Sequence, residues 1–286
     1  RWTKDIILYH REKRIDVNAR LLRDSEPNLE LYFAFPFAAN KPEFRFEASG
    51  SVIEPCVDQL PGSNTDYYSV QSWVEMSDPS GTVAWSSVDN HMAEFGGLWP
   101  GYVSGAHHGV TGPGYGHPFL KPGEITRGHI YSLVMYNNYQ TNFINVQPSE
   151  FTCRYSFTSF ETARDTVRSA SFGRGIANPP LGVWMTGPRD GELPGEGSFC
   201  HIDADNVILL CLKRAEDNDG LILRLLETEG RETDVSVTLP WADISAVRKT
   251  DLVERNGDNL PCIGSTFNVK IKSRGMQTIR LQADSE

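Results

Sequence analysis

Apolar and polar residues alternate along most of the chain, with the period of two that is typical of β-strands with one buried face. In residues 29–38 the apolar side chains share one face of the expected strand: Leu29, Leu31, Phe33, Phe35 and Phe37. Glu30 and Tyr32 fall on the opposite face. The same pattern predicts further strands over residues 67–78, 81–89, 130–137, 150–157, 207–215, 220–230, 234–241, 267–273 and 276–284.

Turn residues separate several of these strands. Pro79, Ser80 and Gly81 join the ranges 67–78 and 81–89. Residues 211–226 are expected to form a hairpin, because the Asn, Asp and Gly between its two apolar runs tolerate a positive φ.

One helix is expected, over residues 158–173. Thr158 and Glu161 have the spacing of a capping box, and Gly173 stands where a helix would end. The apolar stripe of this helix is thin, so we expect the helix to lie on a sheet or at its end; it comprises Phe160, Ala163, Val167 and Ala170.

Many strands, one short helix and no βαβ alternation predict an all-β fold, an antiparallel sandwich. A stretch rich in Gly, Pro and charge at 186–198 marks an internal boundary. We therefore expect a larger β-domain over 1–186, a linker over 187–197 and a small C-terminal β-sandwich over 198–286.

Composition and charge limit the classes of partner that this chain is expected to bind. A net charge of -10 argues against nucleic acid or an anionic membrane. The longest apolar run, VILLCL at 207–212, is far shorter than the roughly 20 residues that a membrane span needs. The chain starts without Met or a signal-like segment, so we expect an excised fragment. Five cysteines without CxxC spacing indicate buried thiols in a reducing compartment, and hence a cytoplasmic protein.

The segment SGAHHGVTGPGYGHPF, residues 104–119, holds three histidines: His107, His108 and His117. A three-His metal site is one interpretation, but no carboxylate or cysteine lies among them to offset the charge of a metal ion. Residues 96–123 contain nine of the 25 glycines and four prolines. We therefore favour a covering loop, which closes over a substrate or fills an interface.

A second group of candidates is MYNNYQTNF, residues 135–143. Its Asn and Gln side chains offer neutral donors and acceptors beside aromatic rings, which is the combination that sugar hydroxyls and C–H faces require. A polar strand end, where Asn serves the local backbone, is the competing interpretation.

Carboxylates provide weaker candidates. Asp58 and Asp66 precede a strand, and a pair of carboxylates can serve as acid and base in glycoside hydrolysis. A role in a turn or cap is favoured for Asp66, and the spacing in the sequence does not establish the distance between the two carboxylates. For Asp89 and His91, a structural pair and a catalytic pair are equally open interpretations.

Taken together, these segments resemble the C-terminal region of family-38 glycoside hydrolases, the α-mannosidase family, especially its bacterial members. The motifs that carry the resemblance run in order from about residue 5 to 283: YFAFPFAAN, VIEPCVDQLPGSNTDYYSVQSWVEMSD, VAWSSVDNHMAEFGGLWP, YSLVMYNNYQTNF, CRYSF, VILLCLKRAEDNDGLILRLLETEG and MQTIRLQAD.

The resemblance implies an antiparallel β-supersandwich, like that of galactose mutarotase, in the larger β-domain. It also implies that zinc, the nucleophilic aspartate and the acid/base carboxylate belong to an N-terminal β/α-barrel that this chain lacks. No catalytic residue, metal ligand or cofactor therefore carries over to this sequence. The expected partners are that barrel and an α-mannoside or related glycan, with no nucleic acid and no membrane.

The resemblance implies a supporting role for this chain, at the rim of the sugar site. The candidates for rim or sugar contacts are Tyr67, His91, Asn137, Asn138, Tyr139 and Asn142. A noncatalytic C-terminal region of an α-mannosidase-like hydrolase is the leading hypothesis. A self-sufficient carbohydrate-binding module is the alternative, and an autonomous mutarotase-type or lyase-type enzyme using His91 or His117 is a third.

Overall fold

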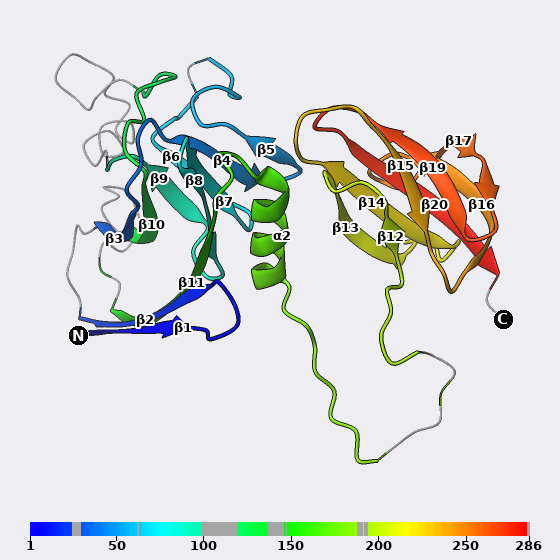
Figure 1. Cartoon of the computed structure of the whole chain (residues 1–286), viewed down its shortest axis with the longest axis horizontal. Coiled ribbons are helices and arrows are strands. Elements are labelled where there is room, and N and C mark those ends of the chain that lie inside the picture. Colours follow the sequence, from blue (N-terminus) through cyan, green and yellow to red (C-terminus); the bar gives the residue numbers. More distant parts are fainter. Residues whose placement is uncertain are drawn as a thin grey trace. The chain divides into compact units, whose positions relative to one another are not determined.

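The computed structural model describes residues 1–24, 30–61, 63–98, 119–136, 146, 148–187, 191 and 194–284. It contains two compact units, Arg1–Pro179 and Pro180–Glu286 (Figure 1). The described residues form antiparallel sheets and one short helix, which confirms the all-β antiparallel fold class. None of the described helices is both long and apolar enough to cross a membrane.

The first unit has two described sheets. The larger runs in the spatial order β1 (Trp2–Leu8), β2 (Ile15–Arg23), β11 (Ser149–Phe160), β8 (Gly81–Ser87), β7 (Val74–Asp78), β4 (Glu43–Ala48) and β5 (Ser51–Ile53). The smaller runs in the order β3 (Glu30–Pro36), β10 (His129–Tyr136), β9 (Met92–Phe95) and β6 (Tyr67–Ser69).

An aromatic core joins these two sheets. The ring of Phe35 on β3 lies 4.9 Å from that of Tyr155 on β11 and 5.5 Å from that of Trp85 on β8, centroid to centroid. The Tyr155 hydroxyl donates to Ser132 Oγ on β10 at 3.1 Å, which satisfies both buried polar groups. Phe33 and Phe35 thus face the core, as their alternation with Glu30 and Tyr32 predicts.

Both predicted hairpins are confirmed. Strands β7 and β8 pair from Val74–Trp85 to Asp78–Gly81, and the Ser80 N–H donates to Asp78 Oδ1 in the turn. In the second unit, β13 (Val207–Arg214) pairs with β14 (Leu221–Glu227), and the turn places Gly220 at a φ of 85°.

The predicted helix bounds are wrong. Residues 158–160 continue β11, and helix α2 spans Thr166–Ala177 with Asp165 as its N-cap, whose side chain accepts from the Arg168 N–H. Thr158 and Glu161 therefore form no capping box. Gly173 does not end the helix but lies inside it, where a Cβ would meet Trp73 Cβ at 2.3 Å.

Helix α2 packs on β7 and β8 of the larger sheet, as the thin apolar stripe predicts. Its buried face is polar as well as apolar. Ser169 and Thr166 donate hydrogen bonds to the two carboxylate oxygens of buried Glu75 on β7, at 3.0 and 3.2 Å. Arg174 and Ser72 likewise engage buried Glu47 on β4.

The second unit is a small sandwich. One sheet runs in the order β12 (His201–Ile202), β15 (Thr233–Thr238), β19 (Thr266–Ile271) and β18 (Cys262–Ile263). The other runs β13, β14, β20 (Met276–Asp284), β16 (Asp243–Thr250) and β17 (Asn256–Leu260). Their inward residues form one apolar core that includes Leu223, Leu225, Val237, Ile271 and Ile279.

All five cysteines are free thiols. Cys153 is buried, whereas Cys56, Cys200, Cys211 and Cys262 are only partly buried, so the expectation of five buried thiols is correct for Cys153 alone.

Candidate functional site

A row of polar and aromatic side chains crosses the outer face of the smaller sheet. Tyr67 on β6 and Tyr131 on β10 both pair with Glu94 on the strand between them. Ala93 and Phe95 face the core, so Glu94 points to the opposite face of β9. Glu94 is nevertheless only 3% exposed. A buried carboxylate therefore lies between two tyrosines on the outer face.

Tyr32 and His129 extend this row. The Tyr32 hydroxyl lies 3.4 Å from Glu30 Oε2, and burial together with a hydrogen bond to Glu94 raises the pKa of Tyr32 far above its usual value. His129 Nδ1 lies 3.1 Å from the Tyr131 hydroxyl. We call Tyr32, Tyr67, Glu94, His129 and Tyr131 the outer-face cluster.

The outer-face cluster combines neutral phenol donors, an acceptor carboxylate and aromatic rings. Such groups hydrogen-bond to hydroxyls and pack against apolar C–H faces. Sequence reasoning identified Tyr67 but missed Tyr32, Glu94 and Tyr131. Alternation had already assigned Tyr32 to the face away from the core; only the strand register reveals which tyrosines flank Glu94.

The structure describes two of the six predicted rim residues. Tyr67 belongs to the outer-face cluster. His91 precedes β9 with an exposed side chain, and its carbonyl accepts from the Val70 N–H at 2.7 Å, three positions along the chain from Tyr67. Asn137, Asn138, Tyr139 and Asn142 lie outside the described residues.

Arg154, rather than His91, engages Asp89. The Asp89 carboxylate accepts from the Arg154 backbone N–H, Nε and a terminal guanidinium nitrogen at 2.8, 3.0 and 2.7 Å. These hydrogen bonds hold the pKa of Asp89 below its usual value, and His91 contributes only a smaller electrostatic effect. This arrangement favours the structural interpretation of Asp89.

The other acidic candidates take part in local turns. Asp58 Oδ2 accepts from the Glu54 N–H at 3.0 Å. Asp66 is 1% exposed, and its N–H donates to Asn64 Oδ1 at 2.8 Å. The histidines His107, His108 and His117 lie outside the described residues. Within the part of the chain that is described, no group of three or more His, Cys, Asp or Glu could hold a metal ion.

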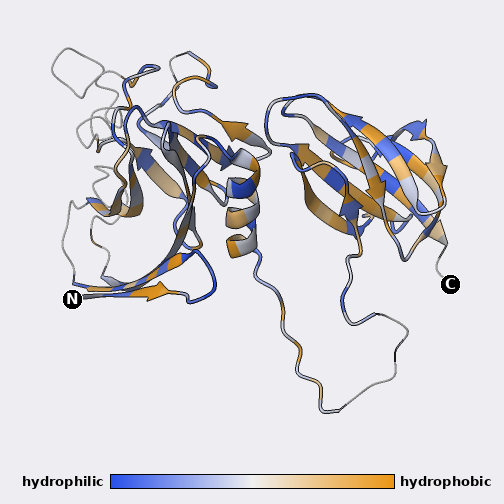
Figure 2. Ribbon diagram, viewed as in Figure 1, coloured by the Kyte–Doolittle hydropathy of each residue, from blue (hydrophilic) through white to orange (hydrophobic). Residues whose placement is uncertain are grey.

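The edge strand β1 carries an apolar row that solvent reaches. Trp2, Ile6 and Leu8 are 64%, 60% and 70% exposed. Figure 2 shows hydrophobic residues along the strand that begins at the N-terminus. Their ladder partners on β2 are Leu21, Val17 and Ile15, which belong to the core-facing side of the sheet. We call Trp2, Ile6 and Leu8 the β1 apolar row.

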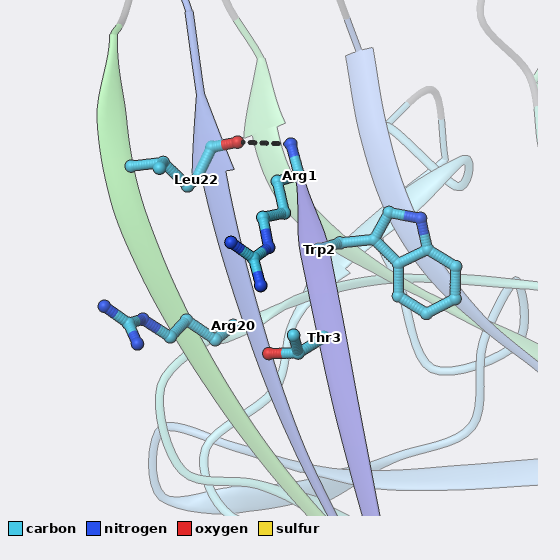
Figure 3. Close-up of a pocket in the computed structure, with 5 residues that line it drawn as sticks. All are labelled: Arg1, Trp2, Thr3, Arg20 and Leu22. Atoms are coloured by element: carbon cyan, nitrogen blue, oxygen red, sulfur yellow. Dashed lines mark hydrogen bonds between the residues drawn. The ribbon is translucent and has the colours of Figure 1, made fainter.

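A shallow cavity of about 170 Å³ lies at the start of β1. The Arg1 amino group donates to the Leu22 carbonyl at 2.9 Å there, and Trp2 projects to the opposite side of the strand from Arg20 and Leu22 (Figure 3). The indole of Trp2 is therefore turned toward the core-facing side of the sheet, at a position where the sheet is uncovered.

Comparison with known proteins bears on both units. Residues 206–279 match the model of the glycosyl hydrolases family 38 C-terminal beta sandwich domain. The fold is similar to that of an alpha-mannosidase from Enterococcus faecalis V583, with a TM-score of 0.68 and 11% identity.

That similarity covers 98% of this chain and 29% of the alpha-mannosidase chain, so this chain spans less than a third of its length. No curated protein sequence matches the chain. The resemblance to the C-terminal β-domains of family-38 glycoside hydrolases, predicted from the sequence motifs, is thus confirmed by a family match in the second unit and by the fold of nearly the whole chain.

Proposed function

We propose that this chain is the noncatalytic C-terminal region of an α-mannosidase-like glycoside hydrolase. In this proposal it packs on an N-terminal catalytic barrel of the same polypeptide and contributes to the rim of a site for an α-mannoside or related glycan. The observation that carries the proposal is the coverage of the fold match, which takes in nearly all of this chain but 29% of an alpha-mannosidase.

The β1 apolar row supports a packed partner. Burying a large apolar side chain contributes about 1.5–3 kcal/mol relative to leaving it exposed. Trp2, Ile6 and Leu8 continue the core-facing side of the sheet into solvent, with Lys4 between Trp2 and Ile6 on the same face, and exposed apolar side chains gathered in this way indicate an interaction site. The row is therefore suited to a permanent interface with further polypeptide.

Free strand edges support the same conclusion. Among the described strands, β1 ends the larger sheet and β3 ends the smaller one. Lys4 Nζ lies 5.4 Å from the ring centroid of Phe33, which brings the core-facing side of β1 close to β3. A strand that paired with the free edge of β3 would cover the β1 apolar row and remove an edge that favours aggregation.

The outer-face cluster supports the rim assignment. Its phenol hydroxyls match the neutral hydroxyls of a glycan, with Glu94 buried among them, and Tyr67 was predicted as a rim residue. We assign the zinc ion that the family resemblance implies to the catalytic barrel, with no ligand from this chain. We also place the protein in the cytoplasm, where free thiols such as these five persist.

The test compares two proteins on an aryl α-mannoside: the 286-residue chain alone, and the same chain joined to its upstream barrel. We expect hydrolysis only by the longer protein. Tyr32→Phe in the longer protein should raise KM with little change in kcat, because a rim contact binds ground state and transition state alike. Zinc-independent turnover by the 286-residue chain would reject the proposal.

A further inference from the structure

A second cavity lies in the second unit, far along the sequence from the outer-face cluster. Its volume is about 400 Å³, within the range of roughly 300–1,000 Å³ that small-molecule sites occupy. Its walls include Pro194, Glu196, Phe199, Pro240 and Trp241. We call it the Trp241 pocket.

Two aromatic rings give the pocket its shape. Trp241 and Phe199 are 46% and 59% exposed, although large aromatic side chains normally contribute to a core. Their ring centroids lie 6.3 Å apart with an interplanar angle of 68°, so the two rings meet nearly at right angles. One ring face can therefore stack on a flat ligand while the other ring flanks its side.

The pocket is held in place before any ligand arrives. Trp241 Nε1 donates to the Phe199 carbonyl at 2.7 Å, which fixes the orientation of the indole. Ser198 Oγ donates to the Cys200 carbonyl at 2.8 Å and keeps the Phe199 segment in a turn. A ligand that binds to such a preorganised surface loses less free energy to ordering.

The chemistry of the walls selects the ligand. Among the described residues that line the cavity, Glu196 is the acidic side chain and none is Lys or Arg, so an anionic ligand is disfavoured. Gly195 and Gly197 leave backbone open to approach, since a Cβ on Gly195 would meet no atom within 4 Å. Apolar faces beside a hydrogen-bond acceptor suit a neutral ring that carries hydroxyl groups.

We propose that the Trp241 pocket binds a pyranose unit of a neutral saccharide, with its C–H face on Trp241 and a hydroxyl donating to Glu196. The choice of an α-mannosyl unit rests on the proposed function. The pocket would make the second unit a glycan-binding unit.

Titration of the 286-residue chain with methyl α-D-mannopyranoside and an α-mannobiose tests this, with the backbone amide resonances of residues 195–199, which all variants retain, as the readout. We expect a saturable shift with a Kd on the order of 1 mM. Trp241→Ala should abolish it, Trp241→Phe should retain weakened binding, and Glu196→Gln should weaken it several-fold. Trp184→Ala is the matched control, because Trp184 is also exposed, at 92%, and lies outside the pocket.

No saturable shift, or an equal shift in Trp241→Ala, would overturn the inference. So would binding of a proline-rich peptide in place of sugar, since aromatic grooves also accept such segments. Hydrolysis by the barrel-containing protein is measured separately. If the barrel-containing protein hydrolyses the substrate but no sugar binds at Trp241, the pocket is rejected and the proposed function is kept. If sugar binds at Trp241 but the barrel-containing protein is inactive, the proposed function is rejected and the pocket is kept.

Discussion

Ile6 lies directly opposite Val17 in the ladder between β1 and β2, yet Ile6 is 60% exposed and Val17 only 6%. Side chains at directly paired positions share one face of a sheet. On its core-facing side, the larger sheet is therefore buried at Val17 on β2 but exposed at Ile6 on β1. This relationship is the physical basis for proposing a missing neighbour rather than a self-contained domain.

Ile6→Glu should destabilise the barrel-containing protein and leave the stability of the 286-residue chain nearly unchanged. In the 286-residue chain Ile6 is already exposed, so we expect the free energy of unfolding to change by less than about 0.5 kcal/mol. In the barrel-containing protein we expect a loss of at least about 1.5 kcal/mol, because a buried apolar contact is removed. Urea unfolding of both proteins measures this.

The matched control for Ile6→Glu is Ile263→Glu, since Ile263 is 87% exposed on β18 of the second unit. It should be neutral in both proteins. An Ile6→Glu effect of the same size in the short and the long protein would contradict a docked β1.

Two glycines of helix α2 provide an internal comparison. A Cβ at position 173 would lie 2.3 Å from Trp73 Cβ and 2.8 Å from the Ser72 carbonyl oxygen, whereas one at position 175 would meet no atom within 4 Å. Gly173→Ala should destabilise the chain by roughly 1–3 kcal/mol through overpacking. Gly175→Ala should stabilise it by about 0.5–1 kcal/mol through helix propensity. Thermal unfolding distinguishes them, and equal effects would show that α2 is not seated on Trp73.

Glu75 predicts a pH dependence of stability. Burial raises the pKa of Glu75, although hydrogen bonds from Ser169 and Thr166 offset part of that shift. A carboxyl whose pKa is higher in the folded than in the unfolded state stabilises the fold at low pH, and this contribution is lost as pH rises through the folded pKa.

Glu75→Gln should therefore remove part of the stability loss that the wild type shows as pH rises above the ordinary pKa of a glutamate. Urea unfolding at several pH values provides the comparison. Glu161→Gln is the control, because Glu161 is exposed near the same helix. If Glu75→Gln and wild type lose stability in parallel over this range, Glu75 is not titrating as the structure implies.

Local patterns predicted many strands but missed β1, β2, β4 and β16, and the predicted strand 67–78 is two strands, β6 and β7, in different sheets. The helix bounds were wrong for a physical reason. Thr158 and Glu161 satisfy a capping box by spacing, but residues 155–160 of β11 pair with residues 82–87 of β8. This ladder outweighs a local cap, and the helix starts only after the chain leaves the sheet, at Asp165. The sequence around Gly173 predicts a helix end, whereas the structure shows that glycine is required there because the helix lies close to Trp73. Neighbouring residues in the sequence do not reveal that contact.

The candidate site shows the same limit. Alternation predicts which face Tyr32 occupies, but the three tyrosines around Glu94 come from three different strands, β3, β6 and β10, and only the register unites them. Phe199 and Trp241 are likewise distant in the chain and joined by one hydrogen bond. Sequence patterns predict faces, whereas contacts between distant segments require the fold.

Oxidative footprinting of tryptophan tests the central claim most directly. Trp2 and Trp184 are both exposed in this chain, at 64% and 92%. When the upstream barrel is present, we predict that oxidation of Trp2 falls at least tenfold while Trp184 keeps the rate it has in the 286-residue chain. Equal oxidation of Trp2 with and without the barrel would contradict the account, because the apolar row on β1 would then have no partner to cover it.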